Sequence, residues 1–136
     1  MAMTGRSASR RLLIQALYQH QISGHDRSVL HEQYINGREA VRADKPYFEQ
    51  LLKEVMASLD ELDERIAVWA DRPVKQIDPI ERAVLWLGVT ELDLHPDLPP
   101  KVVMNEAIEL CKLFGSQDGY RYVNAVLDKA LKDIRP

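Results

Sequence analysis

Two groups of side chains in this sequence have types and spacing that suit contact with a nucleic acid. The first three basic residues, Arg6, Arg10 and Arg11, precede every acidic residue of the chain. Near the other end, Arg121 stands beside Tyr122. A guanidinium can contact a phosphate while a neighbouring aromatic ring stacks on an unpaired base. Each feature alone is a weak signal, but together they predict a surface for single-stranded RNA.

The charge of the whole chain does not by itself indicate a nucleic-acid binder. The sequence has 18 Lys and Arg against 21 Asp and Glu, which gives a formal net charge of −3. A basic N-terminal arm on an acidic body is a common arrangement for a small contact with a polyanion. A solvated terminus that happens to be basic explains the same pattern, and charge alone slightly favours that explanation.

The residue types that carry catalysis or metal binding lack the required spacing. The four histidines, His20, His25, His31 and His95, do not follow a metal-ligand pattern. Cys111 lies on the apolar side of a predicted helix, where a small core residue is expected rather than a nucleophile. There is no glycine-rich phosphate loop and no Gly-x-Ser-x-Gly turn. We therefore predict a protein that is not an enzyme, with no cofactor, no metal and no catalytic residue.

A second candidate surface follows from the spacing of four residues near the N-terminus. Arg11, Gln15, Tyr18 and Ile22 are four, three and four positions apart, so they share one face of a helix predicted over residues 5–22. A tyrosine and an isoleucine beside polar groups are typical of a protein–protein interface. The alternative is that other helices of the fold cover this face.

Helical periodicity dominates the elements that must position these residues, and no stretch alternates long enough to predict a strand. Pro46 falls in the first turn of the third helix, and a bend is expected near residues 58–60. The sequence predicts an all-α bundle of seven helices: residues 5–22, 26–35, 45 to the bend, the bend to 72, 79–94, 100–114 and 117–134.

The fifth predicted helix has the clearest start signal. Asp78 can cap it, Pro79 suits the first helical position, and the Glu81 carboxylate can reach back to the cap. The helix is apolar nearly all round, so it should be central. Gly88 inside it costs roughly 1 kcal/mol relative to alanine, which indicates close approach of a neighbouring helix.

The length of 136 residues suits one domain, and the whole chain, 1–136, is expected to form it. No apolar run approaches the roughly 18 residues that span a bilayer. With a single cysteine as well, these features predict a cytoplasmic protein without membrane contact.

Several motifs spread over nearly the whole chain resemble those of the NusB family of bacterial transcription antitermination proteins. The motifs are QALY at residues 15–18, ERAVL at 81–85, NEAIELCK at 105–112, FG at 114–115 and YVNAVLDK at 122–129. Their combination is specific, whereas any one alone is not. The resemblance implies seven helices in two sub-bundles, consistent with the periodicity.

The resemblance also implies a function. Proteins of this family pair with NusE, a small-subunit ribosomal protein, and the heterodimer binds the boxA element of nascent RNA. This supports an antitermination complex on RNA polymerase, notably during ribosomal RNA transcription. By position, the implied RNA contacts are Arg6, Arg10, Arg11, Trp69, Gln117, Asp118, Arg121 and Tyr122.

The implied NusE contacts are Gln15, Tyr18, Ile22 and Glu81. Glu81 then has two interpretations, a capping carboxylate and a salt-bridge partner for a basic protein, and the two are compatible. Ser7, Ala8 and Ser9 interrupt the arginines of the arm. The thinner arm predicts weak RNA binding by the isolated chain and strong dependence on NusE.

Two alternatives remain beside the RNA-binding adaptor. The same fold occurs as the N-terminal part of ribosomal RNA cytosine methyltransferases, but no cofactor motif or second domain is expected here. A pure protein-interaction bundle without RNA affinity would need only the face that carries Tyr18 and Ile22. That face could also pair two copies of the chain in a homodimer until the partner arrives.

Overall fold

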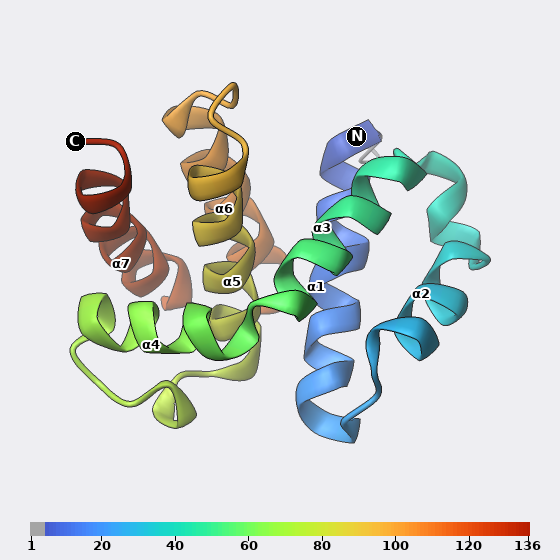
Figure 1. Cartoon of the computed structure of the whole chain (residues 1–136), viewed down its shortest axis with the longest axis horizontal. Coiled ribbons are helices and arrows are strands. Elements are labelled where there is room, and N and C mark those ends of the chain that lie inside the picture. Colours follow the sequence, from blue (N-terminus) through green and yellow to red (C-terminus); the bar gives the residue numbers. More distant parts are fainter. Residues whose placement is uncertain (1–4) are drawn as a thin grey trace. The chain divides into compact units, whose positions relative to one another are not determined.

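The computed structural model describes residues 5–136, and over this range it is all-helical, as predicted. Figure 1 shows the helices in chain order. The seven α-helices are α1 (Gly5–Ser23), α2 (Arg27–Ile35), α3 (Lys45–Ala57), α4 (Leu59–Ala70), α5 (Pro79–Leu94), α6 (Pro100–Phe114) and α7 (Gly119–Ile134). The described residues form two compact units, one up to Ala57 and the other Ser58–Pro136.

The first unit packs α1, α2 and α3 around a common core. Leu13 and Leu17 of α1, Leu30 of α2 and Phe48 and Leu51 of α3 are fully buried. These positions recur with the helical period that the sequence showed, and burying them stabilises the unit.

Side-chain caps set the starts of α2 and α3. An Asp26 carboxylate oxygen accepts a hydrogen bond from the Val29 backbone N–H at 3.0 Å. Asp44 accepts one from the Tyr47 N–H at 3.1 Å. Both satisfy donors that the first turn of a helix leaves free.

The start of α1 is tied to the segment that precedes α3. The Ser9 hydroxyl donates to the Asp44 carbonyl at 2.6 Å, and the Asp44 N–H donates to the Gly5 carbonyl at 3.1 Å. The backbone that carries Arg6 is therefore held in a defined place.

The second unit is built around α5, as its apolar sequence predicted. Most residues of α5 between Glu81 and Leu92 are buried, and the helix packs against α4, α6 and α7. A Cβ on Gly88 would lie 2.8 Å from a methyl carbon of Leu127 in α7. The close helix approach inferred from this glycine is confirmed.

The predicted start of α5 is also confirmed, since Asp78 accepts hydrogen bonds from the N–H groups of Ile80 at 2.9 Å and Glu81 at 3.2 Å. Its C-terminal end has a cap that the sequence did not reveal. The Arg135 guanidinium donates to the carbonyls of Leu92 at 2.9 Å and His95 at 2.9 Å, which closes the last turn.

The main differences from the predicted elements are at their boundaries. Two short 3₁₀ helices, η1 (Arg38–Arg42) and η2 (Val74–Gln76), fill predicted connections. The expected bend separates α3 from α4 at Ser58, and α7 begins at Gly119 rather than near Gln117. No helix in residues 5–136 is long and apolar enough to cross a membrane.

Candidate functional site

The two arginines at the start of α1 differ in accessibility. Arg6 is exposed, with its guanidinium carbon 4.3 Å from the centre of the Tyr47 ring. Arg10 lies 5.5 Å from the same ring but is only 2% exposed. Arg10, also predicted as an RNA contact, is buried beside Tyr47, which is itself buried. Arg6 alone of this pair is accessible to a phosphate.

The predicted partner face of α1 is divided into a covered half and an open half. Gln15 donates to the Glu39 carboxylate of η1 at 2.9 Å, and an Arg11 nitrogen lies 3.9 Å from the same carboxylate. Tyr18 is 41% exposed and Ile22 is 65% exposed. The open half is therefore mainly apolar, which is unusual for a helix surface that contacts only water.

Trp69 of α4 is part of the packing of the second unit. It is 8% exposed, and its indole N–H donates to an Asp133 carboxylate oxygen of α7 at 2.6 Å. The Arg65 guanidinium lies over the ring, 5.4 Å from its centre. With its N–H satisfied and its ring covered, Trp69 joins α4 to α7, and the structure gives no support to its prediction as an RNA contact.

The start of α7 carries the other predicted RNA contacts. Gln117, Asp118 and Arg121 are exposed, whereas Tyr122 is half-buried. The Arg121 Nε–H donates to the Tyr120 hydroxyl at 3.1 Å, and the same nitrogen lies 3.9 Å from Asp118. Part of the Tyr122 side chain is therefore open to solvent.

Sequence reasoning missed three residues in this region. Arg72, just after α4, places its guanidinium 4.5 Å from the centre of the Tyr122 ring. The Lys112 ammonium of α6 lies 5.0 Å from the centre of the Tyr120 ring. We use the name α7 edge for the cluster in which each aromatic ring has a cation over it. Its residues are Arg72, Lys112, Tyr120, Arg121 and Tyr122. The sequence contains no pattern that marks Arg72 or Lys112 as a neighbour of these tyrosines, because each contact joins two different segments of the chain.

The hydroxyl of Tyr122 has no hydrogen-bond partner although it is buried. Burial and the Glu81 charge raise the pKa of Tyr122, while the positive charge of Arg72 lowers it, and the net direction is upward. The phenol therefore stays neutral, and its ring is held as an uncharged surface beneath a cation.

Glu81 lies against the start of α7, whereas its expected contact with NusE stays a prediction. It is 8% exposed, and its carboxylate accepts a hydrogen bond from the Ser116 hydroxyl at 3.4 Å instead of reaching back to its own cap. A Cβ on Gly119 would lie 2.8 Å from Glu81 Oε2, so the carboxylate lies directly against the first residue of α7. Helix N-termini favour negative charge. Glu81 therefore occupies the turn at residues 116–119 with its own negative charge.

Several charges act on the Glu81 carboxyl group. Burial raises its pKa above the ordinary value of 4.5, and the neighbouring Asp78 raises it further. The hydrogen bond from Ser116 and the charge of Arg72 act in the opposite direction, but the net pKa is raised. This carboxylate links α5 to the start of α7 and is enclosed, which does not favour a salt bridge to a second protein.

The features that would indicate catalysis are weak among the described residues. Burial raises the pKa of the Cys111 thiol to about 12, so the group is protonated near neutral pH and is a poor nucleophile. No cluster of three or more His, Cys, Asp or Glu in residues 5–136 could hold a metal ion.

Comparison with known proteins decides the family. The profile of the NusB family matches residues 7–132. A transcription antitermination protein NusB from Idiomarina loihiensis is 41% identical over 136 residues, which cover 100% of this chain and 98% of the relative. The chain belongs to the NusB family. The resemblance seen in the sequence motifs is thereby confirmed, and the protein is a transcription antitermination factor of a non-enzymatic family.

Solved structures of NusB proteins have the same fold. A solved structure of T. maritima NusB matches with a TM-score of 0.81 at 25% identity, covering 98% of this chain and 96% of that one. A NusB solved together with NusE and double-stranded RNA matches with a TM-score of 0.81 at 21% identity, covering 93% of this chain and 96% of that one. The predicted seven-helix NusB fold is confirmed.

Proposed function

We propose that this NusB-family chain is an adaptor that pairs with NusE and, in that heterodimer, binds single-stranded boxA-type RNA. The heterodimer would act in the antitermination complex on RNA polymerase, on ribosomal RNA operons, and therefore in the cytoplasm. The observation that carries the proposal is the α7 edge, where cations and partly open rings lie together.

The α7 edge has the chemistry that unpaired nucleotides require. Bases stack on aromatic rings and on guanidinium planes, while lysine and arginine contact the phosphates. Arg72 and Arg121 are exposed and can move onto a phosphate, which opens the faces of Tyr122 and Tyr120. Gln117 and Asp118 flank the edge as exposed polar groups. We propose that Gln117 and Asp118 form hydrogen bonds to the RNA.

In the first unit, the proposal keeps Arg6 as a phosphate contact and assigns a lesser role to Arg11. Arg6 is exposed, whereas Arg11 is half-buried near Glu39. Arg10 and Trp69 are left out because each is nearly inaccessible to solvent. The proposed RNA contact therefore has few cations, which supports the prediction of weak RNA binding by the isolated chain.

The proposed NusE contact is the open half of the α1 face. Tyr18 and Ile22 are exposed there, with Gln15 at the border of the face. The same apolar surface would support a homodimer when NusE is absent. Glu81 is left out of this contact because its carboxylate is enclosed against α7.

The proposal is tested by fluorescence anisotropy with a labelled boxA-like single strand. We expect the heterodimer with NusE to bind much more tightly than the chain alone, and affinity to fall as salt rises because phosphate contacts release counterions. A duplex of the same sequence distinguishes single-strand binding from the double-stranded RNA seen with the structural relative. Equal affinities with and without NusE would contradict the adaptor proposal.

A matched pair of variants tests the partner surface. Ile22→Asp should abolish pairing with NusE in a pull-down or by calorimetry, because a charge cannot be buried in an apolar contact without a partner. Val41→Asp is the control, since Val41 is exposed in the same unit but lies on η1. NusE pairing without any RNA affinity of the heterodimer would instead favour the pure protein-interaction bundle, which the exposed Tyr18 and Ile22 also support.

A further inference from the structure

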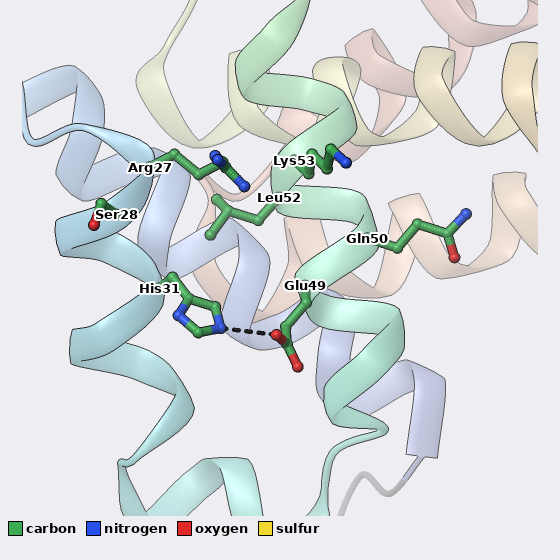
Figure 2. Close-up of a pocket in the computed structure, with 7 residues that line it drawn as sticks. All are labelled: Arg27, Ser28, His31, Glu49, Gln50, Leu52 and Lys53. Atoms are coloured by element: carbon green, nitrogen blue, oxygen red, sulfur yellow. Dashed lines mark hydrogen bonds and ion pairs between the residues drawn. The ribbon is translucent and has the colours of Figure 1, made fainter.

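A pocket in the first unit lies outside both of the surfaces described above. It has a volume of about 490 Å³ and lies between α2 and α3. Its size is in the range of small-molecule sites, which run from roughly 300 to 1,000 Å³. Figure 2 shows Leu52 at the centre of the pocket, between groups contributed by the two helices. The pocket is thus large enough for a ligand about the size of a nucleotide.

One end of this pocket is cationic. Arg27 extends from α2 toward α3 above Leu52, and Lys53 comes from α3 at the same end (Figure 2). Both side chains are exposed, and neither makes an ion pair with another described residue. The Ser28 hydroxyl adds a neutral hydrogen-bonding group on α2. Two cations without an ion-pair partner among the described residues suit a phosphate group.

The other end of the pocket has different chemistry. The His31 Nε2 and the Glu49 Oε2 are 3.0 Å apart, which links α2 to α3. The second carboxylate oxygen of Glu49 has no partner among the described residues and can accept a hydrogen bond. A ligand that extends from the cationic end toward Glu49 therefore meets an acceptor for hydroxyl groups.

We propose that the α2–α3 pocket binds a ribonucleotide, with the phosphate between Arg27 and Lys53 and the ribose hydroxyls donating to Glu49. An acidic peptide fits less well, because Glu49 would repel its carboxylates. The ribonucleotide is either free in solution or one unit of an RNA strand, since the phosphate and ribose are the same in both. The site does not depend on the α7 edge.

The test is isothermal titration calorimetry of the full chain with adenosine 5′-monophosphate, with adenosine as the control that lacks phosphate. We expect binding of the monophosphate and at least about tenfold weaker binding of adenosine, because charge-assisted hydrogen bonds to the phosphate are lost. Equal binding of the two, or no binding of the monophosphate, would overturn the proposal.

Variants locate the site. Arg27→Ala and Lys53→Ala should each weaken binding of the monophosphate by about tenfold. Lys45→Ala, an exposed lysine of α3 outside the pocket, is the matched control and should leave binding unchanged. The loss of affinity in Lys45→Ala to the same extent would show only general attraction to positive charge and would also overturn the proposal.

The ribose contact and the source of the nucleotide need separate measurements. Glu49→Gln should reduce the preference for adenosine 5′-monophosphate over its 2′,3′-dideoxy analogue. Equal binding of inorganic phosphate and of the monophosphate by the unchanged protein would refute the ribose contact. If Lys53→Ala also weakens binding of an RNA pentanucleotide, the ligand is an RNA unit; if only the mononucleotide is affected, it is a free nucleotide. Tyr122→Ala should leave binding of the monophosphate unchanged, so this site can fail or hold independently of the proposed function.

Discussion

Two aromatic rings with an arginine over them, Trp69 of α4 and Tyr122 of α7, differ in how far the ring is enclosed. At one, Arg65 covers Trp69, which is 8% exposed and donates its N–H to Asp133. At the other, Arg72 covers Tyr122, which is half-buried and keeps a buried hydroxyl without a partner.

The difference shows that a cation over a ring does not by itself indicate a binding surface. At Trp69 every polar atom of the ring is satisfied and the ring is closed to solvent, so the contact stabilises the fold. At Tyr122 the cation is exposed and the ring is partly open, so a base and a phosphate can replace the contacts that the pair makes. Substitutions at the two rings should therefore separate stability from RNA binding.

The largest expected effect is on stability, from Trp69→Ala. Removing this buried indole leaves a cavity between α4 and α7 and an Asp133 carboxylate without its donor, which should lower the free energy of unfolding by about 3–5 kcal/mol. Chemical denaturation followed by circular dichroism measures the change. Val68→Ala is the control, since Val68 is 77% exposed and next to Trp69, and it should change stability by about 0.5 kcal/mol or less. Unchanged stability with lost RNA affinity would make Trp69 an RNA contact after all.

Tyr122→Ala should instead weaken binding of boxA-like RNA by the NusE heterodimer. Base stacking on an aromatic side chain contributes about 1–3 kcal/mol, and the alanine variant loses it. Fluorescence anisotropy measures the affinity, and Asn124→Ala provides the control because Asn124 is exposed on the same helix. If both variants bind RNA like the unchanged protein, Tyr122 does not stack on a base.

Tyr122→Phe sharpens the comparison, because it keeps the ring and removes only the hydroxyl. A buried hydroxyl without a partner destabilises the folded state, so its removal should raise the free energy of unfolding by up to about 1 kcal/mol. RNA affinity should not change, since stacking needs only the ring. A loss of affinity in the anisotropy measurement would mean that the hydroxyl gains a hydrogen-bond partner in the RNA complex.

The smallest effect is a pH dependence at Glu81, the carboxylate at the start of α7. Its pKa in the folded protein is raised above 4.5, so the unfolded chain releases the proton first as pH increases. The free energy of unfolding therefore falls as pH rises through this range, and the loss is complete above the folded pKa.

Glu81→Gln removes the titrating group, so the variant should lack this fall. Denaturation midpoints measured at several pH values between about 4 and 7 test the difference, with Glu109→Gln, an exposed glutamate of α6, as the control. Identical pH profiles for the unchanged protein and Glu81→Gln would show that the proton on Glu81 is not linked to folding.

Local signals in the sequence predicted most of the helices. The cap at Asp78 forms hydrogen bonds within a few residues, so the sequence specifies it directly. Gly88 correctly indicated the close approach of a neighbouring helix, because a glycine inside an apolar helix leaves room for one. The connections that became η1 and η2 could not be predicted, since short 3₁₀ turns have little periodicity.

The candidate site was predicted only in part. Tyr122 was identified because it stands beside Arg121 and begins a family motif, and both signals are local in the sequence. Trp69 and Arg10 were expected at the surface, but their partners, Asp133 and Tyr47, are distant in sequence and enclose them. Arg72 was not identified from the sequence, because its contact with Tyr122 joins residues that are 50 positions apart.

Periodicity, caps and family motifs thus determined the helices, the fold class and the family, because each depends on residues that are close together in the chain. Tertiary structure alone decided which rings and charges are accessible, since the accessibility of a side chain depends on what other helices place over it. For this reason the sequence did not indicate that Arg72 lies over Tyr122, that Arg10 and Trp69 are buried, or that the Glu81 carboxylate lies against the start of α7.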